Sequence, residues 1–445
     1  MRLSLRRFEL TKAVPLAISR GSSSGSTRLL VTLEHGGITG LGETGPFDTG
    51  HRHFDADVIA SELQAIAPRI ATLTISTQNI RTQSITTQSI RTQNITTLVT
   101  PREGTPTGGT STGGLPEQVT EQVLEQGTDA EISATNDTAN NTAHDTAIGP
   151  ELPSATLESL LSAVEPLLDG VSPPARCGLD LALQDWWGQR QGLPLHQLWG
   201  LDPGACVATS VTLGLGTTEA VLARLEQWWL QLPASRIKLK LGSPDGLDHD
   251  RELVCAVAER LRQRQQQCGQ TCELQVDANG GWDLEAARAM APWLAMQGVV
   301  LLEQPLAPLC DADADTAGFA ALKPDCPLPL IADESCWNRH DLHRLAPYVD
   351  GINIKLLKSG GLGEALAMAR EARSKGLRVM VGCYGDGSLL NGAAAQLLPL
   401  VDWPDLDSHL NLIDDPFMGL EIRGDVLQPP SGPGLGIRWR GPLPR

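Results

Sequence analysis

Aromatic residues, paired cysteines and long apolar runs are scarce in this chain, and each scarcity excludes a class of protein. Phe, Trp and Tyr make up 4% of the 445 residues, and none lies between Phe54 and Trp186. No apolar stretch approaches the ~20 residues of a membrane-spanning helix, and the opening MRLSLRRFELTKAVPLAI has no apolar core of a secretory signal. Nine cysteines without paired spacing favour reduced thiols in a cytoplasmic protein.

Positive charge is also in deficit. The chain has 35 Lys and Arg against 52 Asp and Glu, a formal net charge of −17. This balance argues against nucleic acid or an anionic membrane as the main partner. With 41% hydrophobic residues, the chain is long enough to bury a large core in two domains.

Composition changes sharply inside the N-terminal half. Residues 73–149 are rich in Thr, Gln, Asn and Gly, and four copies of a TQ(N/S)I repeat follow one another from Thr77. A period of five residues matches neither a helix nor a strand, so we expect a low-complexity insert, with a short stacked solenoid as the alternative. The predicted domains are a capping domain over 1–200 that carries this insert, a barrel over 201–414, and a segment over 415–445 that returns to the cap.

Strands and helices alternate from about residue 207 to residue 410. Eight β-rich runs are separated by helical patterns such as LEAARAMAPWLAMQG. This alternation predicts a (β/α)8-type barrel of the α/β class, a modified TIM barrel with an α+β capping domain from both chain ends. A Ser/Gly-rich loop is expected at 19–26, where it would form a lid carrying Arg20.

Charged residues stand at the C-terminal ends of five of these strands. The runs RIKLKLG, LQVDANG, VVLLEQP, LPLIADES and GINIKLL are otherwise almost entirely apolar. A buried charge is costly unless it is paired or bound to a metal, and active sites of such barrels lie at the C-terminal strand ends. We therefore expect one active site made of Lys238, Lys240, Asp277, Glu303, Asp333 and Lys355.

The carboxylates and the lysines predict different parts of the chemistry. Asp277, Glu303 and Asp333 end adjacent strands without a Cys or His partner, which suits Mg²⁺; salt bridges or helix caps are the alternative. Lys240 and Lys355 lie on opposite strands of the predicted barrel, so one could remove a proton from a carbon and the other return it on the opposite face.

These motifs together resemble the enolase superfamily, in its muconate-lactonizing-enzyme-like subgroup. The likeness rests on Lys-x-Lys, Asp-x-Asn, Glu-Gln-Pro, Asp-Glu-Ser and Asn-x-Lys with Lys-Ser-Gly-Gly, and it excludes only 73–149. It implies that Lys240 and Lys355 are the acid/base pair and that Lys238 supports a substrate carboxylate. It also implies that Asp277, Glu303 and Asp333 hold one Mg²⁺ per subunit, which stabilises an enediolate.

Within the subgroup the chain is most similar to dipeptide epimerases of the L-Ala-D/L-Glu type. The similarity lies in Asp405-Leu-Asp407, Asp414-Asp415-Pro416-Phe417 and Gly432-Pro-Gly-Leu-Gly436. By resemblance Asp405 and Asp407 bind the free amino group of a dipeptide, and Ser210 contacts the substrate; on spacing alone the two aspartates fit a polar loop equally well. At Gly-Cys-Met-Leu-Glu-Ser this chain has GCYGDG instead, so Tyr384 and Asp386 are expected to reshape the substrate pocket.

Three hypotheses follow for the function. The first is Mg²⁺-dependent epimerisation of a dipeptide at the α-carbon of its C-terminal residue by a cytoplasmic isomerase, with a homo-oligomer as a possible assembly. The second keeps the site but assigns o-succinylbenzoate synthase, N-acylamino acid racemase or muconate cycloisomerase activity, whose substrates lack the ammonium for Asp405 and Asp407. The third is a binding protein that acts through the 73–149 insert, and deletion of that insert would distinguish it.

Overall fold

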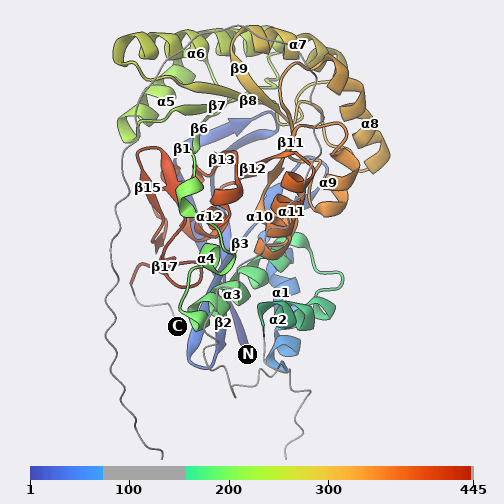
Figure 1. Cartoon of the computed structure of the whole chain (residues 1–445), viewed down its shortest axis with the longest axis vertical. Coiled ribbons are helices and arrows are strands. Elements are labelled where there is room, and N and C mark those ends of the chain that lie inside the picture. Colours follow the sequence, from blue (N-terminus) through green and yellow to red (C-terminus); the bar gives the residue numbers. More distant parts are fainter. Residues whose placement is uncertain (74–155, 442–445) are drawn as a thin grey trace, which may run out of the picture. The chain divides into compact units, whose positions relative to one another are not determined.

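The computed structural model describes residues 1–73 and 156–441. The predicted insert lies outside these residues, apart from Leu73. Eight parallel strands form the centre of the described structure and follow one another in chain order (Figure 1). They are β6 (Ser210–Leu213), β7 (Arg236–Lys240), β8 (Glu273–Asp277), β9 (Val299–Glu303), β10 (Leu330–Ala332), β11 (Gly351–Ile354), β12 (Arg378–Gly382) and β13 (Trp403–Asp405).

The last strand of this sheet lies beside the first, and hydrogen bonds from or to side chains connect the two regions. Ser210 Oγ donates to Asp405 Oδ1 at 2.6 Å, and Leu406 N donates to Thr209 Oγ1 at 3.2 Å. The sheet therefore closes on itself, which confirms the predicted (β/α)8-type barrel.

Helices follow the barrel strands and cover their outer side (Figure 1). In α7, Asp283 caps the first turn by accepting from Ala286 N, and Ala287, Met290, Ala291 and Leu294 are buried. Their i, i+3, i+4, i+7 spacing gives one apolar stripe that faces the sheet. The helices of this layer are α5 (Thr218–Gln231), α6 (Leu247–Cys268), α7 (Leu284–Met296), α8 (Ala312–Leu322), α9 (Arg339–Leu345), α10 (Leu356–Ser359), α11 (Leu362–Ser374) and α12 (Ser388–Ala395).

The N-terminal region forms a three-stranded antiparallel sheet packed against helices. Its strands β1 and β2 pair down to Ile18 and Gly21, so the loop expected at 19–26 is wrong: only Ser19 and Arg20 form the turn. The residues expected in the loop instead continue the hairpin, where their backbone groups form hydrogen bonds with β1. The elements are β1 (Arg2–Ile18), β2 (Gly21–His35), β3 (Ile38–Thr44), α1 (Ala56–Ala71), α2 (Leu157–Val164), α3 (Pro173–Gln191) and α4 (Leu195–Leu198), with short strands β4 (Phe47–Asp48) and β5 (His53–Phe54).

The C-terminal segment packs against the first strand of the N-terminal sheet. Phe417 and Trp439 stack edge-to-face with ring centroids 5.1 Å apart, and Phe8 of β1 packs on both rings, at 5.6 and 6.2 Å. Such aromatic pairs add about 0.5–1.5 kcal/mol each beyond the area they bury. The segment contains β14 (Phe417–Met418), β15 (Glu421–Arg423), β16 (Val426–Gln428) and β17 (Arg438–Trp439).

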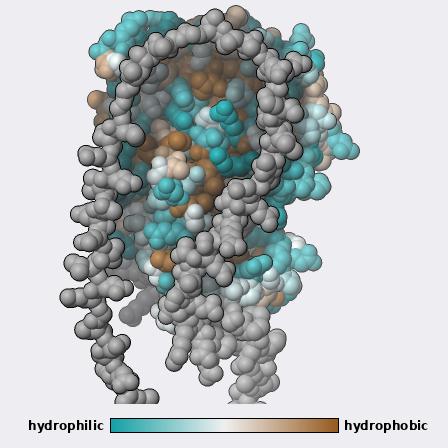
Figure 2. Space-filling model, in the orientation of Figure 1, coloured by the Kyte–Doolittle hydropathy of each residue, from teal (hydrophilic) through white to brown (hydrophobic). Residues whose placement is uncertain are grey.

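The surface of the described residues is mainly polar where the outer helices lie. On the face in Figure 2, hydrophilic residues dominate the rim and hydrophobic residues gather toward the middle. Among the described helices, none is long and apolar enough to cross a membrane.

Candidate active site

Three carboxylates come together at the carboxyl ends of β8, β9 and β10. Asp277 and Glu303 are the last residues of their strands, and Asp333 follows β10 directly. All three are fully buried, and one oxygen from each lies within 4.8 Å of the others. Register explains the closeness, because Asp277 pairs with Glu303 in the parallel ladder.

Four lysines surround this carboxylate cluster. Lys238 Nζ lies 2.6 Å from Asp405, 2.7 Å from Glu303 and 3.0 Å from Asp277. Lys240 donates to Asp277 at 2.6 Å. On the other side, Lys355 and Lys358 donate to the two oxygens of Asp333 at 2.7 and 2.6 Å.

The pKa values of these buried groups are shifted both by the loss of solvent and by the neighbouring charges. Burial and the neighbouring Asp277 raise the pKa of Glu303 to about 8. Burial opposes ionisation of Asp333 as well, but Lys355 and Lys358 outweigh it and hold the pKa of that carboxyl well below its usual range. Likewise, burial disfavours charge on Lys238, yet Asp405, Glu303 and Asp277 raise its pKa well above the ordinary value.

Buried oxygen atoms without a hydrogen-bond donor gather around the same cluster. Leaving such an acceptor unpaired costs about 1–3 kcal/mol, so this concentration suits a hard cation such as Mg²⁺ with its preference for oxygen ligands. Within the described residues these atoms are Asn279 Oδ1, Glu334 Oε2 and Asn353 Oδ1. Glu303 Oε2, beside them, makes an ion pair with the Lys238 ammonium at 2.7 Å. The residues at these strand ends thus fit a divalent cation.

The backbone turns sharply just after two of the strands. Asn279 has φ 45° and Gln304 has φ 35°, conformations that non-glycine residues seldom adopt. Asn279 is held by a bond from its N to Asp277 Oδ1 at 2.8 Å, and Gln304 Oε1 accepts from Asp333 N at 2.9 Å. Strained residues held by such bonds are typical of active sites.

Lys240 and Lys355 line one cavity of about 400 Å³. Lys240 ends β7 and Lys355 directly follows β11, and these two strands lie opposite in the ring. We call this cavity, lined by Lys240 and Lys355, the main cavity. Tyr384 lines it too, and its ring lies 4.4 Å from Lys355 Nζ. The hydroxyl of Tyr384 is buried and has no hydrogen-bond partner among the described residues. The main cavity therefore offers two lysines on opposite strands and one free hydroxyl.

A smaller adjoining cavity, of about 70 Å³, contains Asp405 and Asp407. Asp405 is the last residue of β13, and Asp407 directly precedes the helical turn Ser408–Asn411, so the two aspartates do not lie on one strand. Both carboxylates still line the small cavity. Ser210 donates to Asp405 at 2.6 Å and orients that carboxylate, while Thr212 N donates to Asp407 at 2.6 Å.

Asp386, predicted as a substrate contact, does not line either cavity. Its carboxylate accepts from Arg28 at 3.0 Å and from Tyr384 N at 3.1 Å. Arg28 is fully buried and also bonds Glu43 at 3.1 Å. The structure therefore places Asp386 in an ion-pair network that joins the N-terminal sheet to the loop after β12.

The turn of the β1–β2 hairpin is bonded to the strand ends of the barrel. Arg20 donates to Glu334 at 2.8 Å and to the carbonyl of Asn279 at 2.7 Å, and Ser19 Oγ donates to the same carbonyl at 3.1 Å. Arg20 is thereby paired inside the protein rather than free for a substrate carboxylate.

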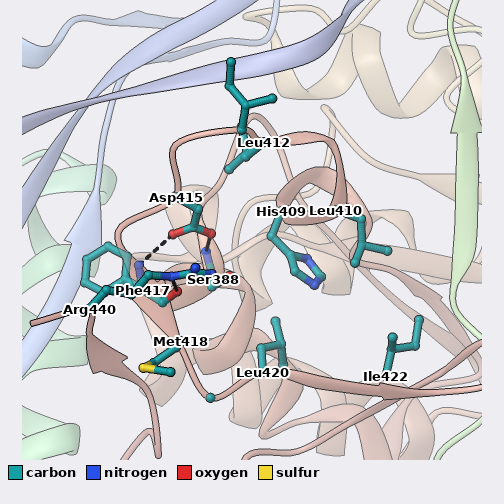
Figure 3. Close-up of a pocket in the computed structure, with 12 residues that line it drawn as sticks. Ser388, His409, Leu410, Leu412, Asp415, Phe417, Met418, Leu420, Ile422 and Arg440 are labelled. Carbon is teal, nitrogen blue, oxygen red and sulfur yellow. Dashed lines mark hydrogen bonds between the residues drawn. The ribbon is translucent and has the colours of Figure 1, made fainter. Parts of the chain in front are cut away.

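A further cavity of about 400 Å³ lies beside the C-terminal segment (Figure 3). Leu410, Leu420 and Ile422 line it, and Asp415 accepts from Ser388 N at 2.8 Å and from Phe417 N at 3.0 Å. None of the predicted site residues lines it. It is therefore separate from the candidate active site.

Comparison with known proteins agrees with the fold. A family profile described as "Enolase C-terminal domain-like" matches residues 220–442, and the chain belongs to this family. The "Hydrophobic dipeptide epimerase" of Flavobacteria bacterium (strain MS024-2A) is 38% identical over 266 residues, which cover 60% of this chain and 73% of that protein. The "L-Ala-D/L-Glu epimerase" of Bacteroides thetaiotaomicron is 34% identical over 285 residues, covering 63% and 68%.

A solved structure supports the fold over nearly the whole chain. The dipeptide epimerase from Cytophaga hutchinsonii, complexed with Mg and the dipeptide D-Ala-L-Val, aligns with a TM-score of 0.70 at 20% identity. The alignment covers 98% of this chain and 95% of that one. The resemblance predicted from the motifs is confirmed at the level of the family.

Two lysines near the site were not singled out from the sequence. Lys358 belongs to the Lys-Ser-Gly-Gly motif, and its burial beside Asp333 was foreseeable from that motif. Lys12 lines both cavities, although it lies far away in the sequence and carries no motif. Only the tertiary fold brings it there.

Proposed function

We propose that this protein epimerises dipeptides at the α-carbon of the C-terminal residue, with Mg²⁺ as cofactor. The observation that carries the proposal is that Lys240 and Lys355 reach one cavity from opposite strands, beside a buried cluster of three carboxylates. A tetrahedral α-carbon between two lysines can lose its proton to one of them, become planar, and gain a proton from the other lysine on the opposite face. That exchange inverts its configuration.

Asp277, Glu303 and Asp333 would hold the cation. Bound there, Mg²⁺ would supply positive charge next to the substrate carboxylate, whose negative charge grows as the α-proton leaves. Lys238, expected to support the substrate carboxylate, lines neither cavity. Its ammonium instead balances negative charge in the cluster through contacts at 2.6–3.0 Å with Asp405, Glu303 and Asp277. Tyr384 supplies a hydroxyl donor without an internal partner.

Asp405 and Asp407 bind the free ammonium of the dipeptide in the small cavity. Two carboxylates with fixed orientation suit one ammonium, since charge-assisted hydrogen bonds are about twice as strong as neutral ones. This pair favours a dipeptide over an N-acylated or succinylated substrate, which lacks the ammonium. Homo-oligomer formation, a cytoplasmic location and the absence of nucleic-acid or membrane partners stay predictions from the sequence.

Deuterium exchange tests the proposal directly. L,L-dipeptides incubated in D₂O with Mg²⁺ should gain one mass unit and form the epimer, as followed by mass spectrometry and chiral chromatography. Lys240→Ala and Lys355→Ala should each abolish epimerisation, and each should lose exchange with a different stereoisomer of the substrate. Lys375→Met, on an exposed residue that pairs with Glu371, is the matched control. Epimerisation that persists in both lysine variants would refute the mechanism.

A further inference from the structure

Lys12 lies at the one interruption of the β1–β2 pairing, between Thr11 and Leu16. There the backbone bonds to the barrel instead: Val14 N donates to Asn411 Oδ1 at 3.1 Å, and Asn411 Nδ2 donates to Val14 O at 2.7 Å. Bulges of this kind redirect side chains and are frequent beside active sites. The barrel thus fixes the position from which the Lys12 side chain extends.

The ammonium of Lys12 has only neutral hydrogen-bond partners. It donates to the hydroxyl of Ser23 at 2.9 Å and to the Ser23 carbonyl at 3.4 Å, and it makes no ion pair within residues 1–73 and 156–441. The nearby carboxylate of Asp386 is paired with Arg28 at 3.0 Å. Burial accordingly lowers the pKa of Lys12, with Asp386 opposing the shift. A half-buried ammonium without a carboxylate is stabilised by an incoming anion.

Lys12 lines both the main and the small cavity, so it stands where they meet. Leu16, Ile18 and Phe47 supply apolar lining to the main cavity. The arginines of this cavity already have partners, because Arg20 pairs with Glu334 and Arg28 with Glu43. The two proposed catalytic lysines also have carboxylate partners, Lys240 with Asp277 and Lys355 with Asp333. Among the lysines and arginines of this lining, Lys12 is the one without a carboxylate partner among the described residues.

The loop after β12 leaves the space above Lys12 open. A Cβ atom on Gly385 would lie 3.6 Å from both Cε and Nζ of Lys12, in van der Waals contact. Because Gly385 has no side chain, a ligand in the main cavity can approach the Lys12 ammonium. A larger side chain at this position would extend over it.

We propose that Lys12 determines substrate specificity by pairing with a carboxylate on the side chain of the residue that is epimerised. The inference rests on the proposed function, which holds the ammonium in the small cavity and the reacting α-carbon between Lys240 and Lys355. The side chain of that residue then extends into the main cavity, its methylene groups against the apolar lining and its charge against Lys12. The predicted substrates are dipeptides with a C-terminal acidic residue.

Matched substrates test this inference. L-Ala-L-Glu and L-Ala-L-Gln have the same shape and differ in charge. A charge-assisted hydrogen bond predicts that kcat/KM of the wild type is about tenfold or more higher for the glutamate dipeptide. Lys12→Met should bring this ratio close to one, and Lys12→Glu should favour L-Ala-L-Lys over L-Ala-L-Glu. Lys375→Met should keep the wild-type ratio.

Calorimetric binding of both dipeptides separates the inference from the proposed function. If the wild type turns over no dipeptide but binds L-Ala-L-Glu more tightly, and Lys12→Met removes that preference, the function fails and the specificity inference stands. If dipeptides are epimerised but glutamine or leucine at the second position is used as well as glutamate, the specificity inference is overturned. An unchanged ratio in a folded Lys12→Met variant overturns it as well.

Discussion

Replacement of Lys238 by Met tests how the carboxylate cluster is stabilised. The ammonium of Lys238 is fully buried and contacts Asp405, Glu303 and Asp277 at 2.6, 2.7 and 3.0 Å. At an effective dielectric constant of about 20, the contacts with the ionised Asp405 and Asp277 each supply roughly 6 kcal/mol of attraction. Methionine has a similar volume, so the variant removes charge without opening a cavity.

We expect Lys238→Met to lower the free energy of unfolding by about 3–5 kcal/mol in EDTA, as when one partner of a buried ion pair is removed. Saturating Mg²⁺ should recover part of the loss, because a cation bound by the three carboxylates replaces part of the missing charge. Urea unfolding followed by tryptophan fluorescence measures both values, with Lys375→Met as the exposed control, expected within about 0.5 kcal/mol of the wild type. A loss below about 1 kcal/mol in EDTA, or no recovery with Mg²⁺, would refute this account of the cluster.

Three further predictions concern the residues around the cavities. Burial and the neighbouring Asp405 raise the pKa of Asp407 to about 6, so its carboxylate is neutralised as the pH falls through 6. The KM for a dipeptide should therefore rise below that pH. If KM rises in the same way at low pH in Asp407→Asn, the assignment is contradicted. Because the folded protein binds the Asp407 proton more tightly than the unfolded chain does, this proton stabilises the fold below pH 3.8, and the contribution is lost as the pH rises from there to about 6. Ser210→Ala removes the 2.6 Å bond to Asp405 and should raise KM about tenfold with a smaller change in kcat; a loss confined to kcat would assign Ser210 another role. Arg20→Met removes the bonds from the hairpin turn to Glu334 and Asn279, so limited proteolysis near residue 20 should be faster than in the wild type, and equal rates would show that the hairpin needs no such bond.

Much of the fold could be predicted because the local signals agree with the global structure. The apolar runs that end in Asp277 and Glu303 were readable as buried parallel strands, since such strands are apolar on both faces and charged only where they end. The stripe of apolar residues in α7 was readable from its spacing. The hairpin at 19–26 was missed because Ser and Gly are typical of loops, whereas its pairing depends on backbone hydrogen bonds with β1.

The site residues that lie at strand ends could be predicted from the sequence, whereas the contacts of residues in loops could not. Asp386 looked like a pocket residue because it follows β12, but Arg28, which lies 358 positions away along the chain, pairs with its carboxylate. Asp407 follows Asp405 by two residues, yet the strand ends at Asp405 and the chain turns. Neither outcome follows from spacing, because both depend on contacts between distant segments.

The barrel, the three carboxylates and the two opposed lysines could be predicted from the sequence alone. Alternating strands and helices and charged strand ends are local patterns, so they can be recognised without the contacts between distant segments. Only the folded structure shows which charged side chains have an ion-pair partner. It paired Arg20 with Glu334 and Arg28 with Asp386, and it brought Lys12 from the first strand to the cavities without a carboxylate partner among the described residues. The physical reason is that a charge's role depends on its neighbours in space, and β1 meets the barrel only when the chain is folded.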